Sequence, residues 1–315
     1  MTYALAMLGL ALLFGGGELL VRGAVALARR FGISPLLIGM TVVGFCTSAP
    51  ELIVSLQAGL RGQPGLAVGN VVGSNVANVL LILGMGALVR PIVIDPRELY
   101  RDTGVMAAGC VLLAALALSG AITRWQGALM VLTLVTFIAY SYRAERRRPS
   151  PPGVLHEHEA AEIGTSPGVG HGLGYLLAGV VSLVVGSRLL IDNATAIATS
   201  IGVSEAVIGL TLVALGTSLP ELATSVVAAF RGHADVAVGN VVGSNTFNIL
   251  GILGATAVVT PIPIDARFAA VDVWVMIAAV AALLPMLFAR VRMGRAYGAT
   301  LVALYIAYTV FLYTA

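Results

Sequence analysis

The chain contains 315 residues, of which 58% are hydrophobic and only 10% are charged, and its mean hydropathy is +0.97. Soluble domains carry about 25% charged residues, so this composition excludes a soluble globular protein and predicts an integral membrane protein. The net charge is +3 and all 18 basic residues are arginine. They form no basic face on a soluble unit, so we expect no nucleic-acid partner.

Apolar segments long enough to span a membrane follow one another along the chain. We expect them at 4–28, 36–60, 66–89, 103–119 and 124–142, and again at 172–198, 206–230, 236–259, 270–289 and 297–314. Residues 143–170 between the two sets are rich in proline, glycine and charge, which is typical of a solvated linker. The predicted units are therefore a five-helix repeat (1–142), a linker (143–170) and a second five-helix repeat (171–315).

The two halves repeat one another at a constant offset of 170 residues. AVGNVVGSN occurs at 67–75 and, unchanged, at 237–245, and TSAPEL at 47–52 corresponds to TSLPEL at 217–222. Nine consecutive identities at one register indicate an internal duplication. We call residues that are 170 positions apart equivalent.

Five spans are an odd number, so the second repeat must enter the membrane from the opposite side. Thirteen of the 18 arginines then fall on the linker's side, against Arg61, Arg124 and Arg267 on the other side. The positive-inside rule places that linker in the cytoplasm and both termini outside. The pattern is typical of inverted-topology transporters in the cell membrane.

Pro50 and Pro220 lie within the second and seventh segments. Proline breaks a helix interior and suits the first turn of a new helix, so both segments are predicted to be two half-helices that meet near the bilayer centre. Carbonyls about one turn earlier, near Gly44 and Ala214, are expected to lose their helical donors and become available to a cation.

Each break is flanked by hydroxyls and one acid: Thr47, Ser48 and Glu51 in the first repeat, and Thr217, Ser218 and Glu221 in the second. A charged side chain at mid-membrane costs at least about 2.5 kcal/mol, so we expect these acids to face a ligand. Two acids at equivalent positions of inverted repeats would face each other. Carboxylates, hydroxyls and carbonyls together form an all-oxygen site that suits Ca²⁺.

The third and eighth segments add a hydroxyl and an amide on one helical face: Ser74 with Asn78, and Ser244 with Asn248. Their neutral oxygens beside a carboxylate are expected to bind Na⁺. Hydrogen bonding between helices is the alternative, and it is favoured for Asn70, Asn75, Asn240 and Asn245.

Glu18 and Arg22 are four residues apart in the first segment, and their equivalents, Arg188 and Asp192, form the same pair with reversed polarity. An ion pair within each helix is favoured over a transport gate.

With these motifs the chain resembles the calcium/cation antiporter superfamily, and within it the prokaryotic sodium/calcium exchanger branch. The motifs TSxPE and GNxxGSNxxN each occur twice in matching register. The resemblance implies an all-α membrane protein with ten helices in two inverted five-helix repeats, whose first and sixth helices slide against a core. It implies that Glu51 and Glu221 hold Ca²⁺. A shell for Na⁺ and Ca²⁺ would comprise Thr47, Ser48, Ser74, Asn78, Thr217, Ser218, Ser244, Asn248 and the carbonyls of Gly44 and Ala214.

The implied function is antiport of Na⁺ and Ca²⁺, which compete for the mid-membrane carboxylates, with no cofactor and no enzyme chemistry. A proton- or potassium-coupled calcium antiporter is the alternative, because Asn248 stands where many relatives carry aspartate. Cation/proton antiporters carry a GNATE-like motif where this chain has TSAPE, which favours sodium coupling. Cys46 also replaces the glycine found at its equivalent, Gly216.

Two other classes fit less well. Enclosed carboxylates would bind a divalent ion too tightly for a simple channel. An intramembrane metalloenzyme would need histidine ligands, and no histidine lies near either glutamate. The expected partners are Ca²⁺, Na⁺ and the lipid bilayer, and a monomer is the simplest expectation for the oligomeric state.

Overall fold

The computed structural model describes residues 2–31, 35–93, 96–146, 169–200, 216–285 and 292–314. Within these ranges seven helices are long and apolar enough to cross a membrane, and a bent pair, Gly39–Thr47 with Ala49–Leu60, makes an eighth. Two shorter apolar helices, Leu219–Phe230 and Phe268–Ala281, lie in the second half. The predicted helical membrane protein is confirmed. The count of ten spans stays a prediction, because parts of the seventh and ninth predicted segments lie outside the described residues.

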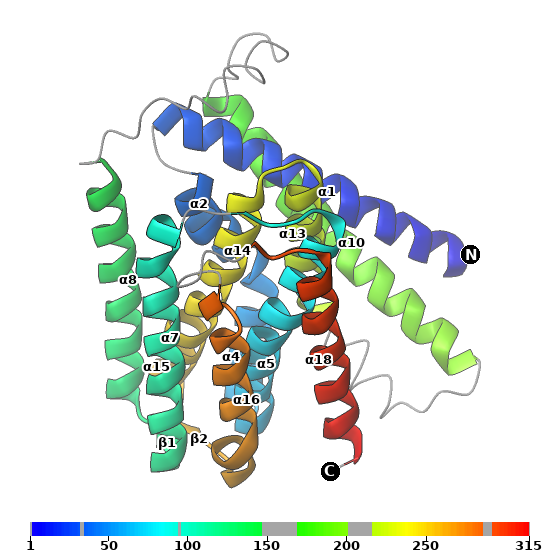
Figure 1. Cartoon of the computed structure of the whole chain (residues 1–315). Coiled ribbons are helices and arrows are strands. Elements are labelled where there is room, and N and C mark those ends of the chain that lie inside the picture. The colour runs from blue at the N-terminus through cyan, green and yellow to red at the C-terminus, as the bar shows by residue number, and fades with distance from the viewer. Residues whose placement is uncertain are drawn as a thin grey trace.

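The first half consists of helices joined by short turns (Figure 1). Its elements, with η for a π-helical segment, are α1 (Thr2–Phe31), α2 (Pro35–Ile38), η1 (Gly39–Val43), α3 (Gly44–Thr47), α4 (Ala49–Leu60), α5 (Pro64–Ala77), η2 (Asn78–Leu83), α6 (Gly84–Val89), α7 (Pro96–Ser119), β1 (Ala121–Ile122) and α8 (Arg124–Arg146). All five apolar segments predicted for this half fall inside these helices or runs of helices.

The second half repeats this order as far as the structure describes it. Its elements are α10 (Val169–Ser200), α13 (Leu219–Phe230), α14 (Ala234–Thr246), η4 (Phe247–Leu253), α15 (Gly254–Val259), β2 (Ile262–Pro263), η5 (Phe268–Asp272), α16 (Val273–Ala281) and α18 (Arg295–Thr314). Most of the predicted linker lies outside the described residues.

The predicted break in the second segment is confirmed. The chain bends by 52° between Gly39–Thr47 and Ala49–Leu60, and Ser48 leaves the helical range with a ψ of 7°. Pro50 then lies in the first turn of α4, where its missing N–H costs no helical hydrogen bond. Ser218 has nearly the same angles, φ −87° and ψ 4°, before α13, whose first turn holds Pro220. Both copies of the motif therefore start a new half-helix at the same place.

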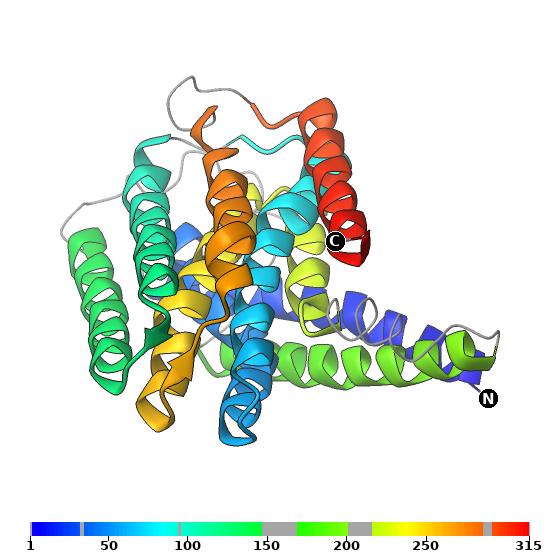
Figure 2. The same cartoon turned by 90° about the horizontal axis from the view of Figure 1, so that it is seen from below.

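The two longest helices, α1 and α10, lie side by side across the rest of the bundle (Figures 1 and 2). Glycines spaced seven residues apart meet along this antiparallel pair: Gly9 with Gly186, Gly16 with Gly179, and Gly23 with Gly172. A Cβ on Gly179 would lie 2.6 Å from the main-chain nitrogen of Leu20. Only glycine permits this approach, so the seam fixes how α1 and α10 pack.

Two further helix pairs join the halves in a reciprocal way: a late helix of each repeat packs on the helix that follows the π-helical segment of the other repeat. α18 packs on α6, where Gly298 approaches Gly84, and α8 packs on α15, where Gly127 approaches the equivalent of Gly84, Gly254. Two short main-chain pairings repeat the pattern at opposite ends of the bundle: β1 with β2, and Ile92 with Met293. Each repeat therefore completes the other.

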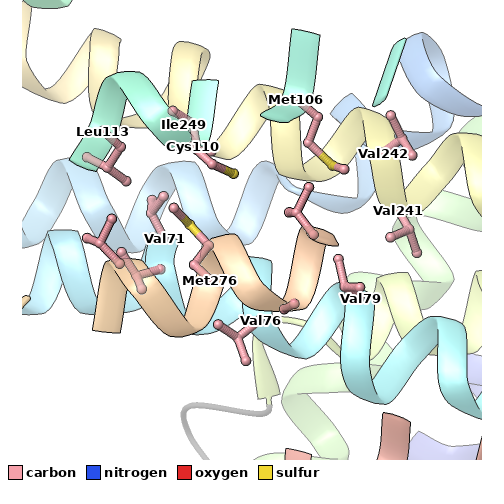
Figure 3. Close-up of a cluster of buried hydrophobic side chains, with 14 of the residues drawn as sticks. Val71, Val76, Val79, Met106, Cys110, Leu113, Val241, Val242, Ile249 and Met276 are labelled. Carbon is pink, nitrogen blue, oxygen red and sulfur yellow. The ribbon is translucent and has the colours of Figure 1, made fainter. Parts of the chain in front are cut away.

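The main apolar core lies where α5, α7, α14 and α16 meet. Figure 3 shows two equivalent methionines, Met106 and Met276, in one cluster with valines of α5 and α14. Cys110 is buried there as a free thiol. Because lipid is as apolar as these side chains, close packing rather than exclusion of water holds this core together. It sets α5 and α14 side by side, where the polar residues of the repeated motif lie.

Candidate cation-binding site

The two acids at equivalent positions of the repeats lie at the starts of two half-helices. Glu51 lies in the first turn of α4 and Glu221 in the first turn of α13. Their exposed fractions are 0% and 1%. The amino-terminal end of a helix carries partial positive charge, which favours a carboxylate here. No ion pair among the described residues involves either acid, so no arginine neutralises them there.

Hydrogen bonds between the repeats bring these acids to one place. Ser48 Oγ donates to Glu221 Oε1 at 2.9 Å, and its equivalent, Ser218 Oγ, donates to Glu51 Oε1 at 3.2 Å. Ser218 also contacts Ser74 Oγ at 3.3 Å. The expectation that the two acids converge from different halves is thus met by crossed serine–glutamate pairs.

Of the buried side-chain oxygens without a hydrogen-bond partner among the described residues, four carboxylate or amide acceptors belong to predicted ligands: Glu51 Oε2, Glu221 Oε2, Asn78 Oδ1 and Asn248 Oδ1. They form two equivalent pairs. An unsatisfied buried acceptor costs about 1–3 kcal/mol, and more when it is charged, so four in one region call for a ligand that supplies positive charge. A hard cation fits this oxygen set.

The amide nitrogens of the same asparagines are already engaged. Asn78 Nδ2 donates to Asn245 Oδ1 at 2.9 Å, and Asn248 Nδ2 donates to Asn75 Oδ1 at 3.0 Å. Asn78 begins η2 and Asn248 lies at the start of η4. Such π-helical segments are frequent at functional sites, but the sequence did not reveal them.

The remaining hydroxyls surround these acids. Thr47 Oγ1 donates to Asn240 Oδ1 at 3.2 Å, and Thr217 Oγ1 is buried with no hydrogen-bond partner among the described residues. Ser74 and Ser244 are both buried on the helices that carry Asn78 and Asn248.

The main chain corrects one prediction. The Gly44 carbonyl accepts the Ser48 N–H at 3.1 Å, and the Thr47 and Ser244 hydroxyl oxygens lie 3.4 Å from it, so the expectation that it loses its helical donor is wrong. Helical N–H groups bond four residues back, so the N–H that Pro50 lacks would have reached Cys46 instead. Ala214, the equivalent of Gly44, lies outside the described residues.

Two serines, Ser55 and Ser225, each share an asparagine with one of the acids. Asn70 Nδ2 donates to Ser55 Oγ at 2.9 Å and to the Glu51 carbonyl at 3.1 Å. Asn240 makes the same two bonds with Ser225 and Glu221 in the second repeat. The predicted bridging role of these asparagines is confirmed. Both serines lie four residues after an acid, at equivalent positions, and this repeat was the available signal.

Comparison with known proteins decides the family. The family model described as "Sodium/calcium exchanger protein" matches residues 1–143 and 171–314. The chain belongs to the sodium/calcium exchanger family. The sodium/calcium exchanger MaX1 of Methanosarcina acetivorans is 30% identical to this exchanger over 99% of this chain and 98% of its own length. The inner membrane protein YrbG of Escherichia coli is 41% identical over 83% of this chain and 81% of its own length.

A solved structure is also similar over nearly the full length. The sodium-calcium exchanger NCX_Mj, soaked with zero Na⁺ and Ca²⁺, has a TM-score of 0.85 and 30% identity, covering 99% of this chain and 98% of that one. The predicted prokaryotic branch of the calcium/cation antiporters is confirmed. Members of this family are transporters and not enzymes, so this exchanger is a multi-pass membrane antiporter of cations that include Ca²⁺.

Proposed function

We propose that this exchanger moves Na⁺ and Ca²⁺ in opposite directions across the cell membrane by alternating access, with both ions competing for Glu51 and Glu221. One observation carries the proposal. The crossed Ser48–Glu221 and Ser218–Glu51 hydrogen bonds hold two buried carboxylates from different repeats in one site.

The ligand assignment follows from which oxygens lack donors. Ca²⁺ takes about six to eight oxygen ligands. The two carboxylates supply up to four, and the amide oxygens of Asn78 and Asn248 add two. Hydroxyls that can rotate toward the ions complete the shell: Thr47, Ser48, Ser74, Thr217, Ser218 and Ser244. The Gly44 carbonyl accepts the Ser48 N–H and keeps a second lone pair, which can bind a cation when the Thr47 and Ser244 hydroxyls turn away from it, so it stays in the proposed set.

Charge explains why loading one ion excludes the other. With Asn248 in place of an acid, Glu51 and Glu221 are the only charged ligands of the set, with a total charge of −2. One Ca²⁺ neutralises it, and Na⁺ ions that use the same carboxylates must leave first. A ligand-dependent shift between inward- and outward-open states then couples the two fluxes. If one net charge moves per cycle, 100 mV biases exchange by about 2.3 kcal/mol.

The membrane arrangement is part of the proposal. Ten spans in two inverted repeats place both termini outside and the 143–170 linker in the cytoplasm, and the arginine distribution supports this orientation. The crossed packing of α18 on α6 and of α8 on α15 agrees with repeats related by a two-fold axis. One chain contains every proposed ligand, so a monomer suffices.

A transport assay tests the coupling ion. Reconstituted vesicles loaded with Na⁺ should take up ⁴⁵Ca²⁺ when diluted into Na⁺-free buffer, at least about tenfold faster than vesicles without the gradient. A protonophore at clamped potential should leave this uptake unchanged. Uptake that needs only a proton gradient, or that requires K⁺, would replace sodium coupling with the proton- or potassium-coupled alternative.

A further inference from the structure

Two further buried asparagines hydrogen-bond the proposed ligands Asn78 and Asn248. Asn75 and Asn245 are equivalent residues with 0% exposed surface, on α5 and α14. Each accepts the amide of a proposed ligand from the other repeat: Asn75 from Asn248, and Asn245 from Asn78.

Main-chain carbonyls fix the direction of these amides. Asn75 Nδ2 donates to the Asn245 carbonyl at 3.5 Å, and Asn245 Nδ2 donates to the Asn75 carbonyl at 3.2 Å. A carbonyl can only accept, so a flipped Asn75 side chain would place its oxygen against another acceptor. Its Oδ1 is therefore held toward Asn248.

The same constraint passes to the ligand. Asn75 presents only an oxygen to Asn248, so Asn248 must turn its nitrogen toward Asn75 and its own Oδ1 away. That Oδ1 is one of the buried acceptors without a donor among the described residues. The equivalent hydrogen bonds run from Asn245 Nδ2 to the Asn75 carbonyl and from Asn78 Nδ2 to Asn245 Oδ1.

We propose that Asn75 and Asn245 are positioning residues that hold the amide oxygens of Asn248 and Asn78 toward the transported cation. This inference rests on the proposed function and extends it to two residues that do not touch the ion. Partners of this kind are worth about 10–100-fold in metal affinity.

The crossed pairing allows a double-mutant test that separates orientation from general stability. Calcium affinity is measured by calorimetry in Na⁺-free buffer. Asn75→Leu alone should weaken it about tenfold. In an Asn248→Leu background, where the oriented oxygen is gone, Asn75→Leu should cause no further loss. In an Asn78→Leu background, Asn75→Leu should still weaken calcium affinity by the same factor of about ten, although Asn78 is nearer to Asn75 in sequence.

The same double-mutant cycle built on Asn245, the equivalent of Asn75, supplies a second set of variants. Asn245→Leu should be silent in the Asn78→Leu background and fully effective in the Asn248→Leu background, with thermal midpoints recorded without Ca²⁺ for every variant. Full multiplication in both backgrounds overturns the positioning role, because a structural defect does not depend on which ligand is present. Wild-type protein that binds no Ca²⁺ overturns the proposed function and this inference together.

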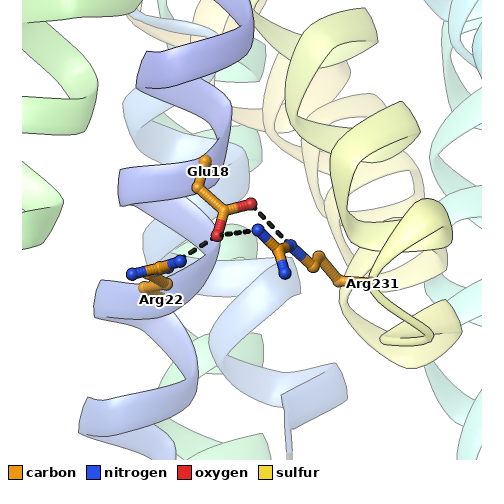
Figure 4. A network of polar contacts seen from close by, with 3 residues as sticks. All are labelled: Glu18, Arg22 and Arg231. Carbon is orange, nitrogen blue, oxygen red and sulfur yellow. Dashed lines mark hydrogen bonds and ion pairs between the residues drawn. The ribbon is translucent and has the colours of Figure 1, made fainter.

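A separate observation concerns the contact between α1 and the second repeat. Arg231 binds both carboxylate oxygens of Glu18 on α1: its Nε donates to Oε2 at 2.8 Å, and its Nη2 lies 2.7 Å from Oε1 (Figure 4). Arg22 Nε also donates to Glu18 Oε1, at 2.6 Å. The predicted ion pair within α1 is confirmed, but Arg231, at the end of α13, was not foreseen. This bidentate salt bridge joins α1 to the end of α13, and the two helices also pack against each other.

The corresponding place on α10, where an acid and Arg61 could pair, shows no such contact among the described residues. Arg61 is the equivalent of Arg231 and follows α4 as Arg231 follows α13. The equivalent of Glu18 is Arg188, so the acid that α10 offers to Arg61 is Asp192, the equivalent of Arg22, one turn further along the helix. Arg61, Arg188 and Asp192 are exposed, with no ion pair among the described residues. α10 also makes no contact with α4 comparable to that of α1 with α13. The predicted Arg188–Asp192 pair is thus not seen.

In inverted repeats the contacts of one half in one state become those of the other half in the opposite state. We infer that Glu18–Arg231 and Asp192–Arg61 are alternating clasps, each of which fastens the α1–α10 pair to one repeat in one of the two access states. This inference also rests on the proposed function.

Cross-linking in a variant without Cys46 and Cys110 tests the exchange of clasps. A bifunctional thiol reagent of salt-bridge length is applied to Glu18→Cys/Arg231→Cys and, separately, to Asp192→Cys/Arg61→Cys, during Na⁺-driven Ca²⁺ uptake. Each pair should cross-link, and each cross-link should stop uptake until it is reduced. The inference is overturned if active Asp192→Cys/Arg61→Cys protein never cross-links, or if cross-linked protein of either kind still transports. Both double-cysteine variants should still take up Ca²⁺ before the reagent is added, because neither pair supplies a proposed ligand. Loss of uptake at this stage would overturn the inference that these pairs act only by fastening helices.

Discussion

Replacing either Glu51 or Glu221 by glutamine is expected to abolish calcium transport while the protein still folds. Glutamine keeps the shape and one acceptor oxygen but removes half of the site's charge, and one carboxylate cannot offset the desolvation of a divalent cation. At a Ca²⁺ concentration 100 times the wild-type Kd, the wild type should gain about 2.7 kcal/mol of unfolding free energy from the ion, and each variant should gain none.

The same substitutions should raise stability when no ion is present. A charged side chain at mid-membrane costs at least about 2.5 kcal/mol, and the amide removes part of that cost. Thermal unfolding with and without Ca²⁺ measures both effects, and ⁴⁵Ca²⁺ uptake measures transport. Asp265→Asn is the matched control, because this acid is exposed and its carboxylate accepts only the Arg267 N–H among the described residues. Wild-type uptake by either glutamine variant would remove that acid from the site.

Gly243→Ala should cause the largest packing defect. A Cβ on Gly243 would collide with the main chain of Met40 in η1, and neither backbone can move without displacing the other's helix. Overpacking of this kind costs about 1–3 kcal/mol, occasionally more. The neighbouring Ser244–Gly44 hydrogen bond spans the same contact, so we also expect calcium affinity to fall. Thermal unfolding in detergent and calcium calorimetry check the two effects.

Gly109→Ala is the control for this substitution. Its Cβ would meet Ile249 at an ordinary 3.6 Å, and the equivalent residue, Ala279, already carries that methyl group. Its thermal midpoint should stay near the wild-type value. An unchanged midpoint in Gly243→Ala as well would show that α14 and η1 do not approach as closely as described.

The duplication explains why much of the site could be predicted. Once Glu51 and Glu221 fall at equivalent positions of inverted halves, symmetry alone brings them together. The break was predictable because the missing N–H of Pro50 is a local property of the chain. The local error at Gly44 came from placing the lost bond six residues back instead of four.

Contacts between the repeats were not predictable in the same way. The Asn75–Asn248 pair depends on how far α5 slides along α14, and that register is set by side-chain packing over the whole interface. The Glu18–Arg231 contact joins residues 213 positions apart, so the pattern within α1 could suggest only the partner four residues away. The offset pairs Arg231 with Arg61 but Glu18 with Arg188, so it could not indicate which acid either arginine would meet.

Calcium calorimetry tests most directly whether two acids, one from each repeat, hold a single ion. Wild-type protein in Na⁺-free buffer should bind one Ca²⁺ per chain, and neither Glu51→Gln nor Glu221→Gln should bind any. Two ions per wild-type chain, with one lost in each variant, would mean that the carboxylates serve separate sites and would contradict the account.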